Sequence, residues 1–223
     1  MQVDAENLVP GAWKSAAMLK AAEMIKELGD KGYFQKGAVA MSHTEAQTEF
    51  VNGRAAMIPC GTWLHSEMAK VIPSGAQMEF MLPPVVQDGK GDPTALLIGI
   101  EPWMVPAKAK NANGAIALFK EMTSLSNAKK FVEQKGTLMA IRGSDQAKVP
   151  AELRTPAKVF KASKTVWSNE LRNWYREMEK ELEGALTSML EGQLTPQEFC
   201  DRCEAAADKT RQDKDIMKHK VAG

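Results

Sequence analysis

Cys200 and Cys203 form the most reactive-looking spacing in the sequence, a C-x-x-C pair. Such a pair does redox chemistry when its first cysteine begins a helix, because the N-terminal amides lower the thiol pKa. Here Thr195 predicts a helix start several residues earlier, and Cys203 shares an apolar stripe with Phe199. We therefore expect both thiols to pack in a core, and no second Cys or His pair is available to complete a zinc site.

The residue types that usually carry catalysis are present without the spacing that catalysis needs. His43, His65 and His219 are scattered, and the sequence contains no H-E-x-x-H, G-x-S-x-G or phosphate-loop motif. The glutamates of 177–183 alternate around a predicted helix with basic neighbours, which is typical of a solvated face. We therefore predict no catalytic site, no metal and no cofactor, and hence no enzyme.

Tryptophan is the residue type best placed to bind a ligand, with five among 14 aromatic residues. Trp63, Trp103, Trp167 and Trp174 are predicted at or near the edges of elements, where binding residues tend to lie. A flat indole stacks on the C–H face of a sugar ring while polar neighbours bind its hydroxyls. Helical phase favours a core position for Trp174 and for Trp13, whereas Trp63 and Trp103 could be core or contact residues.

The elements that must position these residues are mainly helices. Apolar residues recur every three or four positions over 12–28 and 171–190, and Thr44 with Gln47 has the spacing of a capping box. Gly61 follows a predicted strand and is expected there for backbone shape. Further helices are expected at 64–71, 113–123, 126–134 and from 196 onward, and extended segments at 55–59, 78–82, 95–100, 103–105 and 137–141.

Composition limits the class of protein. The 223 residues are 44% apolar and 26% charged, with a net charge of +1, so we expect a soluble globular protein with no basic face for nucleic acid. The first residues carry neither the charged nor the apolar region of a signal peptide. The segment 143–157, with its two prolines, is the best internal boundary.

Three segments resemble a known family. Residues 45–63 end in FVNGRAAMIPCGTW, which resembles the F-x-x-G-x-A-A-M…G-x-W segment of the carbohydrate-binding proteins of ABC importers. Residues 103–106, WMVP, together with 113–123 resemble the W-x-I-P return segment of that family, and 190–198 resemble its terminal helix pair. The resemblance covers the whole chain but only the second half of such a protein.

The resemblance implies an α/β, periplasmic-binding-protein-like type II fold with two lobes and a hinge, here in a helix-rich second half. Residues 1–98 and 150–223 would form a discontinuous C-terminal lobe, and 99–149 the hinge and part of the N-terminal lobe. A sugar or oligosaccharide would lie in the cleft between lobes, and the closed form would meet ABC permease subunits. The family works outside the cytoplasm, where a signal sequence and anchor, both absent from this chain, would bring it to the periplasm or the cell surface.

The resemblance also implies ligand contacts. Trp63 lies on the aromatic position of G-x-W, and 99–103 on the hinge segment that faces the ligand. Three aromatics fall ahead of and within the penultimate helix, where the choice among them stays open. The full set is Trp63, Gly99, Glu101, Trp103, Trp167, Trp174 and Tyr175.

The sugar that the resemblance favours is N-acetylglucosamine or its oligomers, because 53–63 and 100–106 are closest to the binding proteins for those sugars. The alternative is a helical protein-interaction module or an enzyme fragment without a sugar site. Tryptophan fluorescence separates these hypotheses, because a sugar ligand perturbs a contacting indole and leaves a core indole unchanged.

Overall fold

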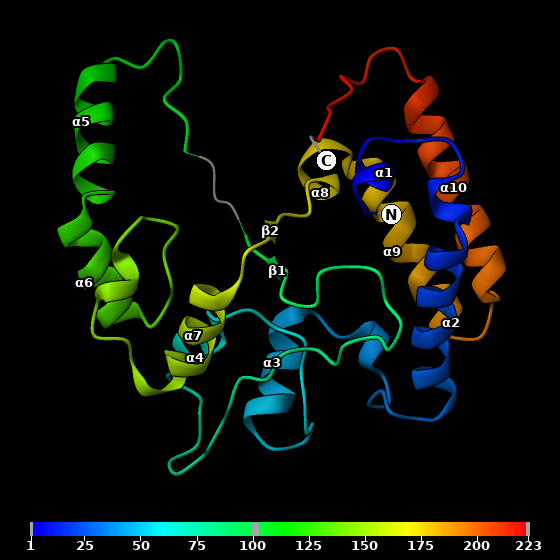
Figure 1. Ribbon diagram of the computed structural model, residues 1–223, viewed down its shortest axis with the longest axis horizontal. Helices are drawn as coiled ribbons and strands as arrows, with labels where there is room; N and C mark the ends of the chain where they lie inside the picture. The colour runs from blue at the N-terminus through cyan, green and yellow to red at the C-terminus, as the bar shows by residue number, and fades with distance from the viewer. Residues whose placement is uncertain (1, 100–102, 222–223) are drawn as a thin grey trace. The chain divides into compact units, whose positions relative to one another are not determined.

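The computed structural model describes residues 2–99 and 103–221 (Figure 1). Residue contacts divide the chain into two compact units. Unit 1 combines Met1–Met41 with Asn169–Gly223, and unit 2 is Ser42–Ser168. The family resemblance implies different boundaries, and these stay a prediction: a C-terminal lobe of 1–98 and 150–223, and a hinge with part of the N-terminal lobe at 99–149.

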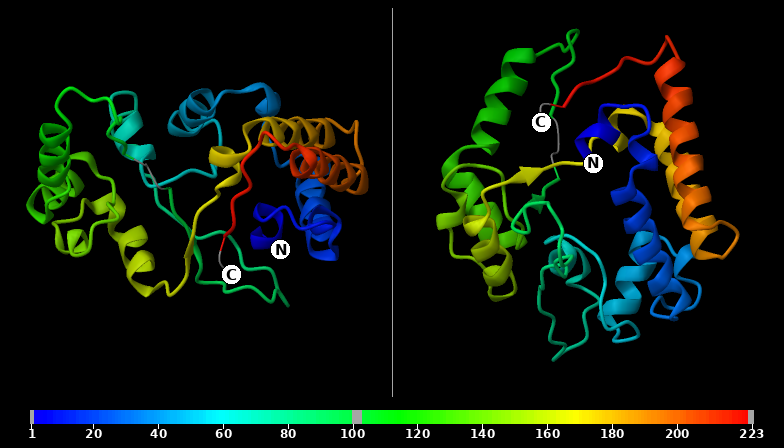
Figure 2. Two further views of the ribbon diagram at one scale, coloured as in Figure 1. Left: turned by 90° about the horizontal axis from the view of Figure 1, so that it is seen from above. Right: turned by 45° about the vertical axis from the view of Figure 1, so that its right-hand side comes forward.

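Unit 1 is helical in its described part, and its longest helix, α10, packs against both α9 and α2 (Figures 1 and 2). Its core is apolar and includes Trp13, Tyr175 and Cys203. Each buried apolar side chain contributes about 1.5–3 kcal/mol relative to an exposed one, so this helix packing supports the unit without a sheet. Its elements are α1 (Gln2–Glu6), η1 (Ala12–Lys14), α2 (Ala16–Asp30), η2 (Ala38–Ala40), α8 (Leu171–Trp174), α9 (Arg176–Leu190) and α10 (Pro196–Gln212).

The ends of the helices in unit 1 follow local chemistry. The predicted start of α10 is confirmed: the hydroxyl of Thr195 accepts from the amide of Glu198, and the carboxylate of Glu198 accepts from the amide of Thr195. The predicted helix over 171–190 is interrupted at Tyr175, whose φ of −134° and ψ of 62° are not helical. The interruption coincides with burial of the Tyr175 side chain, which is 2% exposed.

A buried carboxylate ties the N-terminal segment of unit 1 to α10. Glu204, 5% exposed, accepts from the amides of Gly11 at 2.8 Å and Trp13 at 3.1 Å, and from Arg211 at 3.2 Å. Burial raises the pKa of Glu204, but the two amides and the guanidinium outweigh burial, so the pKa is lowered.

Unit 2 contains short helices, and a small core of Val51, Leu64 and Met68 forms within residues 50–78. Its two short strands pair in parallel, Leu96 with Val166 and Leu97 with Trp167. The elements are α3 (His43–Val51), α4 (Leu64–Met68), β1 (Leu96–Leu97), α5 (Ala112–Met122), α6 (Leu125–Lys135), η3 (Ser144–Gln146), η4 (Ala151–Leu153), α7 (Arg154–Ala162) and β2 (Val166–Trp167).

Several predicted elements of unit 2 differ from the structure. The capping box of α3 is Ser42 with Glu45, not Thr44 with Gln47, because the helix begins earlier and Gln47 is buried. The segments 55–59, 78–82, 103–105 and 137–141 are irregular, and 95–100 contributes only β1 to the described part. A strand needs a hydrogen-bonding neighbour, which none of the described residues provides for the irregular segments.

The described helices include none that combines the length and the apolar character needed to span a membrane.

Candidate functional site

Trp63 lies in the turn before α4, and its ring covers the backbone of Gly61. A Cβ atom built on Gly61 would lie 1.9 Å from Cζ3 of the indole, so no other residue fits beneath the ring. The indole is 45% exposed. The spacing G-x-W therefore holds a tryptophan against the main chain with part of its surface open to a ligand, and Gly61 provides space rather than the backbone shape predicted for it.

Polar side chains lie next to Trp63 along α4, and no sequence pattern predicts them as a group. The hydroxyl of Ser66 donates to the carbonyl of Trp63 at 3.0 Å and lies 3.5 Å from the hydroxyl of Thr137. His65 is 3.2 Å from Glu152. These groups are hydrogen-bonding partners of the type that bind sugar hydroxyls beside a stacking ring. Their partners come from distant segments, so spacing alone gave no signal for them.

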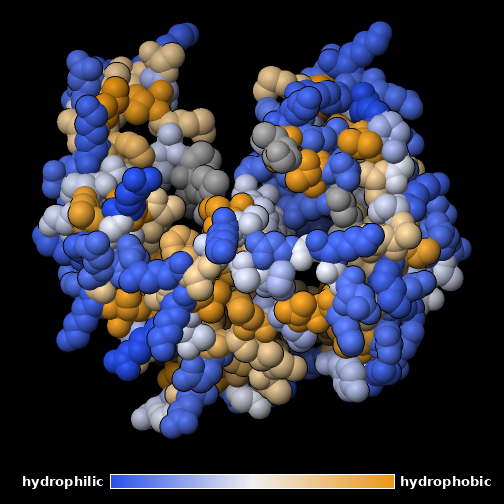
Figure 3. Space-filling model, in the orientation of Figure 1, coloured by the Kyte–Doolittle hydropathy of each residue, from blue (hydrophilic) through white to orange (hydrophobic). Residues whose placement is uncertain are grey.

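The second exposed indole is Trp103, 64% exposed, which follows the undescribed residues 100–102. Its ring lies 5.9 Å from that of Phe119 on α5, at an interplanar angle of 33°. No side chain of α5 is fully buried, and apolar surface gathers over this helix (Figure 3). Trp103 and Phe119 therefore form an exposed aromatic pair that could carry a second stacking surface.

Strand pairing brings two of the predicted contacts close together. Ile98 donates its amide to the carbonyl of Trp167 at 2.8 Å, so Gly99 lies beside β2. The indole of Trp167 is 37% exposed, and a Cβ atom on Gly99 would meet nothing within 4 Å. Glu101, predicted as a contact from the same segment, lies outside the described residues.

The last two predicted contacts lie at the junction of α8 and α9 in unit 1. Tyr175 is buried, and its hydroxyl accepts from the amide of His219 at 3.0 Å. Trp174 is partly buried, packs against the core of unit 1 and stacks on the imidazole of His219, with centroids 4.5 Å apart. The ring of Tyr175 meets that of Trp174 edge-on, with centroids 6.2 Å apart, and the imidazole of His219 covers part of the Trp174 ring.

The predicted ligand contacts therefore fall into several separate groups of neighbouring residues. Gly99 and Trp167 are neighbours, as are Trp174 and Tyr175. Among the described side chains, no ring contact joins Trp63 to Trp103.

The cysteines of unit 1 behave as the sequence predicts. Cys200 and Cys203 are 0% exposed. Burial raises the pKa of the Cys203 thiol to about 12 and also raises that of Cys200. A thiol with so high a pKa carries almost no thiolate at neutral pH, and the thiolate is the reactive form of cysteine. The described residues also contain no group of His, Cys, Asp and Glu side chains arranged to hold a metal ion.

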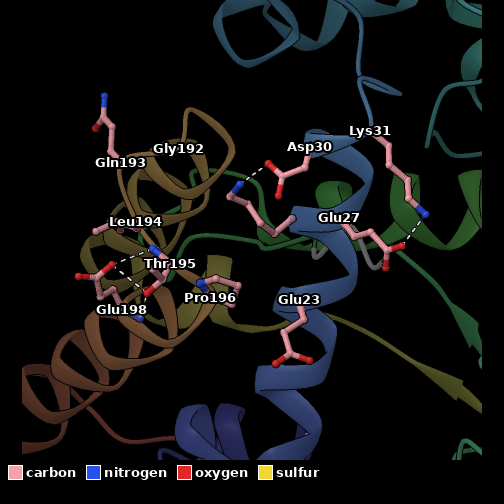
Figure 4. A pocket seen from close by; sticks show the side chains of 11 residues that line it. Glu23, Glu27, Asp30, Lys31, Gly192, Gln193, Leu194, Thr195, Pro196 and Glu198 are labelled. Carbon is pink, nitrogen blue, oxygen red and sulfur yellow. Dashed lines mark hydrogen bonds and ion pairs between the residues drawn. The ribbon is translucent and has the colours of Figure 1, made fainter.

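Unit 1 carries a groove of about 640 Å³ (Figure 4). It lies between α2 and residues 192–198. Its charged groups are largely satisfied: Lys26 pairs with Asp30, Lys31 with Glu27, and Glu198 caps α10. Because no aromatic side chain lines it, the groove offers no stacking surface for a sugar.

Comparison with known proteins decides the family. The model of a family described as bacterial extracellular solute-binding protein matches residues 3–155. The chain belongs to that family. The predicted family resemblance is thereby confirmed, and the family's description places its members outside the cytoplasm.

Two known proteins are similar to most of the chain, and each is named for the sugar that it binds. The chain is 25% identical over 233 residues to the diacetylchitobiose binding protein NgcE of Streptomyces coelicolor, covering 97% of this chain and 47% of the relative. A solved chitin oligosaccharide binding protein superposes with a TM-score of 0.77 at 20% identity, covering 93% of this chain and 53% of that one. The predicted fold class is confirmed, and the chain spans about half the length of both relatives.

Proposed function

We propose that the protein is a component of an ABC importer that captures an oligosaccharide of the N-acetylglucosamine type and delivers it to permease subunits. The observation that carries the proposal is the half-exposed indole of Trp63, held over Gly61 in a chain of the solute-binding family. Both relatives are named for binding chitin-derived oligosaccharides, which supports diacetylchitobiose as the first ligand to test.

Trp63 is proposed as the main stacking residue. Its ring is fixed by contact with Gly61, so little rotamer freedom remains to be lost when a sugar binds. The hydroxyls of Ser66 and Thr137 are close enough to the same turn to bind hydroxyl or acetamido groups of the sugar.

Other predicted contacts have supporting roles. Trp103 and Trp167 are exposed enough to stack on further sugar units, and Gly99 leaves the backbone beside Trp167 open. Trp174 is proposed to contact the ligand with Tyr175 beneath it, and Glu101 as a hydrogen-bonding partner. The mechanism is binding alone: stacking and hydrogen bonds in a cleft whose closure shifts a two-state equilibrium, with no chemical step.

Calorimetric titration with diacetylchitobiose tests the proposal, using the natural protein that contains these residues. We expect saturable heat, and a loss of about tenfold or more in affinity for Trp63→Ala, because a stacking contact and its desolvated surface are removed. Tyr33→Ala is the matched control, since Tyr33 is 70% exposed and lies outside the proposed contacts.

Two results would contradict the proposal. One is the absence of heat with diacetylchitobiose and its longer oligomers. The other is an equal affinity in the Trp63→Ala and wild-type proteins, which would place the ligand elsewhere.

A further inference from the structure

We propose that the C-terminal segment 213–221 is an autoinhibitory cap, in which the imidazole of His219 occupies the face of Trp174 that a sugar ring would use. The inference rests on the proposed function for Trp174 as a stacking residue. All the contacts that carry it lie within unit 1.

The cap begins where α10 ends. Asp213 follows the helix, and its carboxylate accepts from the amide of Asp215 at 2.8 Å, which turns the chain. Ile216 then packs against the core of unit 1, whereas Met217 beside it is 71% exposed. The segment therefore folds back onto the unit without forming a helix or strand.

Two sets of hydrogen bonds fix the end of the cap. The amide of His219 donates to the hydroxyl of the buried Tyr175 at 3.0 Å. The side-chain amide of Asn7 clasps the backbone of Val221: Nδ2 donates to the carbonyl at 3.0 Å, and Oδ1 accepts from the amide at 2.7 Å. Asn7 and Tyr175 lie far apart in the sequence, so this clasp forms only when unit 1 is folded.

The imidazole of His219 lies almost parallel to the indole of Trp174, at an interplanar angle of 17° and a centroid distance of 4.5 Å. This is the stacking geometry that a pyranose would need on the same ring. Because Trp174 also packs against the core of unit 1, the covered face is the one we assign to a ligand. The imidazole and a sugar cannot occupy that face together.

The cap is built to open. Among the described residues, its anchors to the rest of unit 1 are a few hydrogen bonds, the apolar side chain of Ile216 and the stacked imidazole of His219, and the residues of 213–221 are exposed or partly exposed to water. Opening and closing therefore define a two-state equilibrium in which only the open state binds sugar at Trp174, and the apparent affinity falls with the open fraction.

The test compares His219→Ala, which removes the imidazole, with Asn7→Ala, which releases the clasp on Val221 at a distance from Trp174. Met217→Ala is the matched control in the same segment. Acrylamide quenching of tryptophan fluorescence, measured without sugar, reports how exposed the Trp174 ring is. Each measurement is repeated in a Trp174→Phe background, and the difference isolates the signal of Trp174. Calorimetry with diacetylchitobiose reports affinity.

We expect both releasing variants to increase quenching of Trp174 and to raise the affinity by about two- to tenfold, the range that one aromatic stacking contact supports. Met217→Ala should change neither. Asn7→Ala keeps the test valid if His219→Ala fails to fold.

Equal or weaker binding in both releasing variants would overturn the cap while leaving the sugar site intact. The absence of heat in the wild type and all variants would instead overturn the proposed function, and the cap as a competitor of the ligand with it.

Discussion

At the scale of single residues, the fit between Gly61 and Trp63 is the most restrictive feature of the candidate site. The ring occupies the space of a missing side chain, so the smallest substitution already conflicts with it. Trp63 thus depends on a neighbour two positions away for its orientation. Energetically the contact is small, but it fixes where a ligand could stack.

Gly61→Ala tests this dependence. The new methyl group would displace the indole, so we expect a changed tryptophan emission spectrum, a loss of diacetylchitobiose affinity close to that of Trp63→Ala, and a fall of about 1 kcal/mol in the free energy of unfolding. Gly91→Ala is the matched control, because a Cβ atom there meets nothing within 4 Å. Unchanged emission and affinity in Gly61→Ala would show that the ring is not held by this contact.

The thiols give a second prediction at this scale. Cys60 is partly exposed, whereas Cys200 and Cys203 are buried with raised pKa values. A thiol reagent at pH 8 should therefore modify one cysteine per native chain, and all three after unfolding in denaturant. Mass spectrometry identifies the modified residue; rapid labelling of Cys203 in the native protein would contradict its place in the core.

Glu204 predicts a pH dependence of stability. Its pKa is lowered in the folded state, so its contribution is fully present above the unfolded value of about 4.3 and is lost as the pH falls through the folded pKa. Glu204→Gln should lower the free energy of unfolding at pH 7 by about 1–3 kcal/mol.

The difference between Glu204→Gln and wild type should begin to shrink below the unfolded pKa of about 4.3 and should disappear once the pH has fallen through the lowered folded pKa, where the native carboxylate is protonated. Urea unfolding at several pH values measures this difference. The exposed Glu79→Gln serves as the control. A difference that is constant with pH would contradict the role of the charge.

The sequence predicts the burial of single residues better than it predicts their contacts. Helical phase placed Trp13 and Cys203 in a core, and both are buried. Phase also favoured a core position for Trp174, which is only partly buried because the helix breaks at Tyr175. Ser66 with Thr137, and His65 with Glu152, meet only in the folded unit, so no spacing could identify them.

At the scale of elements, helices were more predictable than strands, of which only β1 falls inside a predicted extended segment. The predicted helices at 113–123 and 126–134 are α5 and α6, because capping residues and i, i+4 contacts act within a short stretch of chain. The strand at 55–59 was predicted from its apolar residues alone, yet Met57 is 72% exposed. Pairing depends on distant residues that local patterns do not contain.

The capping box at the start of α10, formed by Thr195 and Glu198, gives the prediction at this scale. Thr195→Ala removes the acceptor for the amide of Glu198, and we expect the free energy of unfolding to fall by about 1 kcal/mol. Thr195→Ser should restore most of it, since serine keeps the hydroxyl. Denaturant unfolding measures both variants, and equal losses in the two would show that the hydroxyl is not the stabilising group.

At the scale of the whole molecule, the chain belongs to the solute-binding family, shares its fold with a solved protein and covers about half the length of each protein compared with it. The resemblance of three segments of the sequence predicted both the family and the fold. The lobe boundaries stay a prediction. The residues that contact a ligand also stay a prediction, and the proposed contacts are divided between the two compact units.

A crystal structure of the natural protein containing these residues, grown with diacetylchitobiose, would show directly where the sugar binds. We predict a pyranose ring stacked on the indole of Trp63, with carbon atoms about 4 Å from the ring plane and sugar oxygens within hydrogen-bonding distance of Ser66 or Thr137. A sugar bound away from Trp63, with that indole still open to solvent, would contradict the account.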